Sequence, residues 1–110
     1  MVKKESKLRR YKMIFSYDGS PFYGYASQVG QVTIQDTVEE ALKTILNKET
    51  KIYASGRTDK GVHAIGQVAD FVSERELDVE KVVYSLNKLL PESIYIKSIE
   101  EVPLEFSSRF

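Results

Sequence analysis

The sequence of 110 residues contains no cysteine, no tryptophan and a single histidine, His63. Without cysteine the chain cannot form disulfides, thiolate metal sites or a cysteine nucleophile. No apolar run approaches the ~20 residues that a membrane-spanning helix needs, and the basic first residues are not followed by the apolar core of a signal peptide. The length is typical of one compact domain. These features predict a cytoplasmic single-domain protein without a membrane partner.

Basic and acidic residues are equal in number, sixteen of each, but they are unevenly spread. Residues 1–12 hold six basic side chains and one acidic side chain, so the rest of the chain holds ten basic and fifteen acidic ones. We expect residues 1–10 to form a basic N-terminal arm. Its charge leaves two interpretations open, a solvated arm or an arm that binds phosphate, because clustered Lys and Arg attract polyanions.

Hydrophobic periodicity predicts four strands, at residues 11–17, 51–54, 63–72 and 94–99. Two helices are expected, one from residue 34 to 46 and one from residue 79 to 90. Thr33 and Asp78 can cap their first turns, and Pro91 ends the second helix. The order β-α-β-β-α-β is that of the ferredoxin-like (split βαβ) α+β fold, in which two helices cover one face of a four-stranded antiparallel sheet.

The other face of such a sheet needs a partner, which could be RNA, another domain or a second subunit. RNA-recognition motifs share this topology and stack bases on aromatic side chains of the sheet. The third strand lacks their basic-glycine-aromatic signature, since residues 66–71 read GQVADF. We therefore expect most of the candidate aromatic residues to lie in the core. These candidates are Tyr17, Phe22, Tyr23, Tyr25 and Phe71.

Two loops are candidates for a functional site. Residues 18–32 form a long connection for so small a domain, and long loops are often functional. Residues 56–64, GRTDKGVHA, form a polar turn between two strands. The spacing of Arg57 and Asp59 suits a site that recognises phosphate and base with an acidic catalyst, and it equally suits a hairpin turn held by an Arg–Asp contact. Spacing alone does not choose between them.

Four segments, in order, resemble the tRNA pseudouridine synthase A (TruA) family. GRTDKGVHAIGQV (residues 56–68) is similar to the family's catalytic motif, and YDGSPFYGY (17–25) to its first loop. TIQDTVEEAL (33–42) is similar to its first helix, and FSSR (106–109) to a later motif. Family members carry a second subdomain, so we identify the chain as an N-terminal half, with residues 11–110 as the subdomain that bears the catalytic aspartate.

The resemblance implies that the chain isomerises uridine to pseudouridine in the anticodon stem-loop of tRNA, with Asp59 as the catalytic residue. No metal or other cofactor is implied. Arg57 would hold the target nucleotide out of the stack. The family's Trp-Gln pair is replaced by Tyr-Ala at residues 25 and 26, and Gln28 would serve instead. The expected RNA contacts are Arg57, Thr58, Lys60, Gln28 and Arg109.

Three further expectations follow. The exposed sheet face or edge favours self-association, so we expect a homodimer. His63 is expected to be a structural hydrogen-bonding residue, and Asp18 a turn residue, in preference to catalysts. The alternative function is a non-catalytic ferredoxin-like module that binds RNA or protein and in which Asp59 is only a turn residue.

Overall fold

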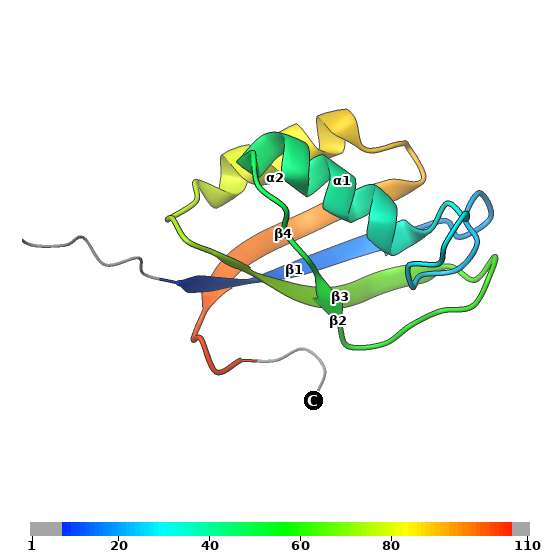
Figure 1. Cartoon of the computed structure of the whole chain (residues 1–110), viewed down its shortest axis with the longest axis horizontal. Helices are drawn as coiled ribbons and strands as arrows, with labels where there is room; N and C mark the ends of the chain where they lie inside the picture. The colour runs from blue at the N-terminus through cyan, green and yellow to red at the C-terminus, as the bar shows by residue number, and fades with distance from the viewer. Residues whose placement is uncertain (1–7, 107–110) are drawn as a thin grey trace, which may run out of the picture.

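A computed structural model describes residues 8–106 (Figure 1). Its sheet has the strand order β2-β3-β1-β4 with every neighbouring pair antiparallel, and both helices lie on one face. The predicted ferredoxin-like α+β fold is therefore confirmed. The elements are β1 (Arg9–Tyr17), α1 (Ile34–Leu46), β2 (Tyr53–Ala54), β3 (Ala64–Ser73), α2 (Val79–Leu89) and β4 (Ile94–Val102).

The core lies between the helices and the inner face of the sheet. From Tyr11 onward, every second residue of β1 points to the helices and is buried, as strand alternation requires. Helix α1 contributes an apolar stripe at helical spacing. The buried residues of these two elements are Tyr11, Met13, Phe15, Tyr17, Ile34, Val38, Ala41, Leu42 and Leu46.

Both predicted helix caps are confirmed. The Thr33 hydroxyl accepts a hydrogen bond from the Asp36 amide at 3.2 Å, and the Asp78 carboxylate accepts one from the Lys81 amide at 3.4 Å. Such caps satisfy amides that have no partner within the first helical turn. Neither helix in the described part of the chain is long and apolar enough to cross a membrane.

Each strand differs from its predicted boundaries, and β3 differs by one residue at each end. β2 begins at Tyr53 instead of residue 51, because the Ile52 amide donates to the Glu39 carboxylate of α1 at 3.0 Å. β1 begins at Arg9 and β4 continues to Val102, because these ends pair with each other. Residues 9 and 10 of the expected basic arm thus belong to the sheet, and residues 1–7 lie outside the described residues.

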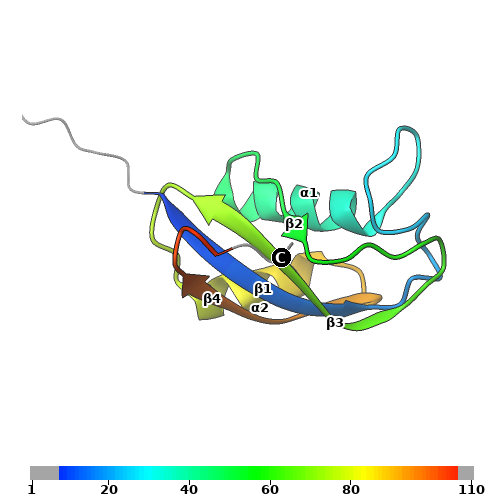
Figure 2. The same cartoon turned by 90° about the horizontal axis from the view of Figure 1, so that it is seen from below.

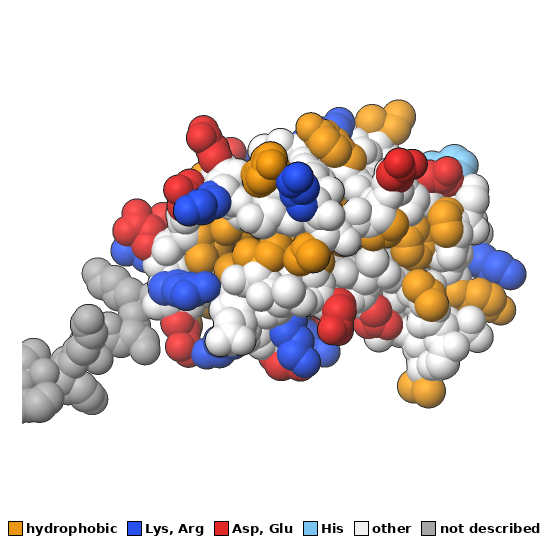
Figure 3. Space-filling model, turned by 90° about the horizontal axis from the view of Figure 1, so that it is seen from above, with side chains coloured by type: hydrophobic (Ala, Val, Ile, Leu, Met, Phe, Trp, Pro, Cys, Tyr) orange, Lys and Arg blue, Asp and Glu red, His pale blue; other side chains and the backbone are white. Residues whose placement is uncertain are grey.

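The two faces of the molecule differ. From the helix side, charged side chains surround exposed hydrophobic ones (Figure 3). Tyr84 and Leu89 of α2 are exposed hydrophobic residues. On the opposite side, the segment after β4 runs across the open face of the sheet (Figure 2). Arg10 of β1 holds it there, because its Nε donates to the Leu104 carbonyl at 2.7 Å.

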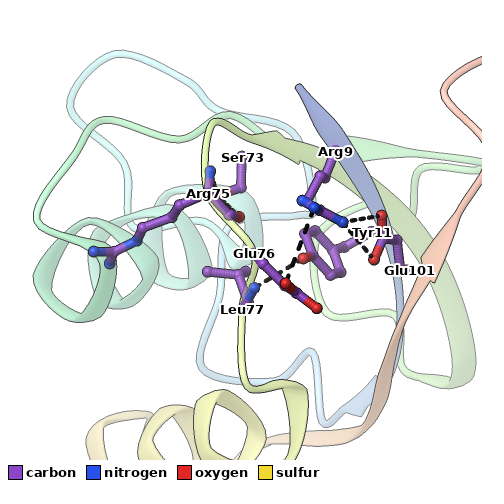
Figure 4. A network of polar contacts seen from close by, with 7 residues as sticks. All are labelled: Arg9, Tyr11, Ser73, Arg75, Glu76, Leu77 and Glu101. Atoms are coloured by element: carbon purple, nitrogen blue, oxygen red, sulfur yellow. Dashed lines mark hydrogen bonds and ion pairs between the residues drawn. The ribbon is translucent and has the colours of Figure 1, made fainter. Parts of the chain in front are cut away.

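Arg10 also pairs with Asp70, a buried carboxylate on β3. Its neighbour Arg9 makes exposed contacts instead, with Glu101 at 3.0 Å and Glu76 at 4.0 Å (Figure 4). A buried carboxylate depends on its cation far more than an exposed one does, because water cannot replace the lost interaction. The two adjacent arginines therefore offer a matched comparison.

We expect Arg10→Ala to lower the free energy of unfolding by about 3 kcal/mol, since it removes the cation that faces the buried Asp70. Arg9→Ala should cost less than about 1 kcal/mol, because its ion pairs are exposed. Urea denaturation of both variants measures the two values. Equal losses would contradict the importance assigned to the Arg10–Asp70 pair.

Candidate active site

Two loops meet at one end of the sheet. The first loop (residues 18–32) leaves β1, and the aspartate loop (residues 55–63) enters β3 (Figure 1). Tyr17, the last residue of β1, pairs with Ala64, the first residue of β3. This antiparallel register places the two loops beside each other although they lie about forty residues apart in the sequence.

Three hydrogen bonds hold the aspartate loop, two of them to the first loop and one to Tyr17 at the end of β1. The Tyr25 amide donates to the Thr58 carbonyl at 3.0 Å, and the hydroxyls of Tyr17 and Thr58 lie 2.8 Å apart. The Gly19 amide donates to Nδ1 of His63 at 2.9 Å. The hydroxyl and the carbonyl of Thr58 are thus engaged within the protein.

Glycine makes the close approach of these loops possible. A Cβ atom at Gly19 would lie 1.9 Å from the Val62 carbonyl oxygen, where no side chain fits. Gly24 has a φ of +92°, and a Cβ there would lie 3.4–3.6 Å from the backbone of residues 58–60. The first loop therefore packs backbone against backbone on the residues that surround Asp59.

The start of the aspartate loop is held from inside the protein by Gln67. Its side chain is buried on the helix-facing side of β3, among apolar neighbours. Its amide group donates to the Gly56 carbonyl at 3.0 Å, and its side-chain oxygen accepts from the Ser55 hydroxyl at 3.4 Å. A buried amide of this kind must be hydrogen-bonded to be tolerated, so it fixes the backbone that it binds.

The anchors determine which side chains of the aspartate loop face solvent. Thr58 points inward, and its neighbours Arg57 and Asp59 are exposed, as is Lys60. The Val62 amide donates to the Asp59 carbonyl at 3.1 Å and closes the turn. The loop thus presents one carboxylate between two cations on a backbone held at both ends.

The first loop is held to helix α1 by Gln35. Its side-chain oxygen accepts from the Ser27 amide at 3.0 Å, and its backbone amide donates to the Tyr25 carbonyl at 2.9 Å. Within the loop, the side-chain amide of Gln28 donates to the Tyr23 carbonyl at 3.0 Å. The loop is therefore a closed, internally bonded structure.

Asp18 and His63 lie side by side where the two loops begin and end. The Asp18 carboxylate accepts from the Ser20 amide at 2.9 Å, and this bonding to Ser20 is the main cause that lowers the pKa of Asp18. His63 Nδ1 lies 3.1 Å from the same carboxylate. The same Nδ1 accepts the hydrogen bond from the Gly19 amide, so His63 ties the start of the first loop to the end of the aspartate loop.

No group of three or more His, Asp or Glu residues between residues 8 and 106 is arranged to hold a metal ion.

The comparison with known families bears on the loops just described. The model of a family described as tRNA pseudouridine synthase matches residues 13–110, which include both loops. The chain belongs to the tRNA pseudouridine synthase family.

Curated relatives agree with this family. Proteins named tRNA pseudouridine synthase A are 48% identical to the chain over 104 residues in Listeria monocytogenes serotype 4a (strain HCC23) and 42% identical over 102 residues in Geotalea daltonii. A protein of that name from Acetivibrio thermocellus is 38% identical over 103 residues. These alignments cover 93–94% of the chain and 42% of each relative. The chain thus spans about two-fifths of the length of these synthases.

The structure brings most of the predicted site residues together. Arg57, Asp59 and Lys60 are exposed on the aspartate loop, while Thr58 and Gln28 make hydrogen bonds within the protein. Arg109 lies outside the described residues. The expectation that most candidate aromatics belong to the core is confirmed: four of the five are buried, and Tyr23 is 40% exposed.

Sequence reasoning assigned no role to Gln67, although it lies in the segment that resembles the family's catalytic motif. Its position in the strand could have indicated that it is buried. Gln67 stands two residues before Ala69 and four before Phe71, so all three lie on the same buried face of β3. Its hydrogen bond to Gly56, eleven residues earlier, could not be inferred from this pattern.

We expect Gly19→Ala to separate the two loops, because its Cβ would collide with the Val62 carbonyl. The free energy of unfolding should fall by about 1–3 kcal/mol, as for other overpacked sites. Hydrogen exchange at the Tyr25 amide, which bonds to Thr58, should become faster. Gly56→Ala is the control, since a Cβ there meets nothing within 4 Å. Unchanged exchange in Gly19→Ala would contradict the contact.

Tyr25 provides a second test of the packing beneath the loops. Its side chain is 2% exposed and packs on Phe15 and Tyr17, and within the described residues its hydroxyl has no hydrogen-bond partner. Burial raises the pKa of this phenol well above its usual range; Tyr17 and Glu39 add to the effect, and Arg57 opposes it. The folded state therefore holds the phenolic proton more tightly than the unfolded state does.

We expect Tyr25→Phe to raise the free energy of unfolding by about 1 kcal/mol at neutral pH, because it removes a buried hydroxyl without a partner. The advantage should grow above about pH 10, where the unfolded wild type loses the phenolic proton and is thereby favoured. Urea denaturation at about pH 7 and about pH 11 measures both effects. Tyr84→Phe, at an exposed tyrosine, is the control. A lower stability of Tyr25→Phe would show that the hydroxyl is bonded.

Proposed function

We propose that the chain is the aspartate-bearing part of a tRNA pseudouridine synthase that isomerises uridine to pseudouridine in the anticodon stem-loop of tRNA. One observation carries the proposal. Asp59 is exposed between two cations on a loop that is anchored at Gly56, Thr58 and His63. Family membership and the curated relatives named tRNA pseudouridine synthase A support it.

A carboxylate suits the chemistry of this reaction. The bond between N1 of uracil and C1′ of ribose breaks, the uracil turns, and a bond between C5 and C1′ forms. The C5 proton leaves and N1 gains a proton, so atoms and charge balance without a change of oxidation state. The Asp59 carboxylate can attack the sugar or the base, or remove a proton, in the way that carboxylates act on glycosidic bonds.

The target uridine must leave its stack before a protein carboxylate can reach it. Flipping a nucleotide costs a few kcal/mol, which protein contacts must offset. We assign this role to Arg57, which is exposed beside Asp59 and can fill the vacated space or bind a phosphate. Lys60, Gln28 and Arg109 are the further proposed RNA contacts. Thr58 is proposed to act through the loop conformation that its two hydrogen bonds maintain.

A homodimer in the cytoplasm is also part of the proposal. β4 is an edge strand, and such edges are ready to pair or to be covered. Ile65 and Tyr95, near the loop end of the sheet, expose large apolar side chains. Sedimentation velocity of the chain measures its association, and a monomer at all concentrations would count against the dimer.

The decisive experiment is tritium release from an anticodon stem-loop RNA labelled at uridine C5. Conversion to pseudouridine detaches this hydrogen, so we expect release by the wild type and none by Asp59→Asn, which preserves the size of the side chain. RNA affinity should stay within about twofold, because the substitution removes no contact that holds the loop. Asp78→Asn is the control, since asparagine also caps helices.

Two results would contradict the proposal. Release that persists in Asp59→Asn would show that another group performs the reaction. RNA binding without release, also after the remaining part of a relative's synthase is added, would favour the alternative of a non-catalytic RNA-binding module.

A further inference from the structure

One aromatic residue of the first loop differs from all its neighbours. Tyr23 is 40% exposed, whereas Phe22 and Tyr25 on either side are buried at 5% and 2% exposure. An exposed aromatic ring offers an apolar face and a polar tip to a ligand, so its place beside the candidate active site is what matters.

The backbone of Tyr23 is held firmly although its ring is exposed. Its amide donates to the Val32 carbonyl at 2.8 Å, and its carbonyl accepts from the Gln28 side chain at 3.0 Å. The next residue, Gly24, packs against the backbone of residues 58–60. The ring therefore projects from a fixed backbone that is docked on the aspartate loop.

Lys60 lies over this ring. Its Nζ is 4.5 Å from the centroid of Tyr23, which is within the range of a cation–π interaction. Lys60 follows Asp59 directly in the sequence, so the ring and the ammonium group lie at the loop that carries the proposed catalytic carboxylate. With the lysine in this position, part of the ring is still open to solvent.

An exposed ring and a cation beside it match the two parts of a nucleotide. A base stacks on an aromatic face, and a phosphate binds an ammonium group. The aspartate loop has one arginine, one lysine and one aspartate, so cations outnumber the carboxylate and attract an anionic partner. An acidic protein surface would match the cations but offers no base to stack on the ring, so the ring and the ammonium group together favour RNA.

From these contacts we infer that Tyr23 and Lys60 together bind one nucleotide of the RNA next to the reacting uridine. The base stacks on the Tyr23 ring, and Lys60 leaves the ring partly or wholly to contact the adjoining phosphate. The inference rests on the proposed function and specifies how the aspartate loop holds RNA beside the flipped uridine.

The chain contains a matched control pair. Lys88 lies over Tyr84 at 5.4 Å, and Tyr84 is 63% exposed. Both residues belong to α2 in the helical layer and lie outside the two loops. The pair has the same chemistry and greater exposure, so it reports what any exposed tyrosine–lysine pair contributes to RNA binding.

Fluorescence provides a direct test of stacking, because the chain has no tryptophan. Tyr23→Trp and Tyr84→Trp each create a protein with one indole. A synthetic tRNA anticodon stem-loop should quench the indole at position 23 at saturation, since a stacked base quenches it, and should leave the indole at position 84 unchanged. Heparin, a polyanion without bases, should quench neither.

Affinity measurements separate the two side chains. Tyr23→Ala should weaken binding of the same RNA about tenfold, and Tyr23→Phe should restore it, because stacking needs the ring and not the hydroxyl. Lys60→Gln should reduce the slope of log affinity against log salt by about one, because one phosphate contact is lost. Tyr84→Ala and Lys88→Gln should change neither quantity. The backbone hydrogen bonds of Tyr23 should keep the loop folded in the alanine variant.

The outcomes distinguish this inference from the proposed function. An unquenched indole at position 23, with wild-type affinity in Tyr23→Ala, overturns the inference and leaves the proposed function intact. Equal quenching by heparin overturns stacking as its cause. Absence of RNA binding by the wild-type chain, measured by fluorescence anisotropy, overturns both.

Discussion

The candidate site depends on one contact, the packing of the first loop's backbone against the backbone of the aspartate loop. At Gly19 even a methyl group would collide with the Val62 carbonyl, and Gly24 lies directly against residues 58–60. Backbone contacts of this kind place Asp59 more firmly than side-chain contacts would, because they involve no rotatable side-chain bonds. A catalytic group must be held near its productive geometry to be effective.

The rest of the fold makes this contact possible. The antiparallel register of β1 and β3 brings the two loops together, and the helices bury the inner face of the strands that carry them. Two glutamines hold the backbones of the two loops, one glutamine for each loop. Gln35 holds the first loop to α1, and Gln67 holds the aspartate loop to β3. Both glutamines act on the backbone, so the loops are held without the exposed side chains between the anchors.

The exposed and buried residues of the aspartate loop have different roles. Thr58 faces inward and uses its polar groups on Tyr17 and Tyr25, so its neighbours on either side face outward. The result is a carboxylate between an arginine and a lysine, on a loop that the first loop supports. Tyr23 extends this exposed group with an aromatic ring, which Lys60 covers in part. Within this short segment, Thr58 therefore holds the loop in place, while Arg57, Asp59 and Lys60 present their charged side chains to solvent.

Much of this could be predicted from the sequence, because it depends on neighbours in the chain. The helix caps at Thr33 and Asp78, the apolar stripe of α1 and the alternation of β1 are local patterns, and they were sufficient for the element order and the fold class. The aspartate loop was found from its motif and its resemblance to a family.

The tertiary structure decided what local patterns leave open. Tyr23 and Tyr25 stand in the same short segment, yet the fold buries Tyr25 against Phe15 and Tyr17 and leaves Tyr23 partly exposed beside Lys60. β2 is short because a carboxylate of α1 takes the Ile52 amide, and Thr58 faces inward because a tyrosine 41 residues earlier meets it. Interactions between distant residues form only when the chain is folded, so no local pattern encodes them.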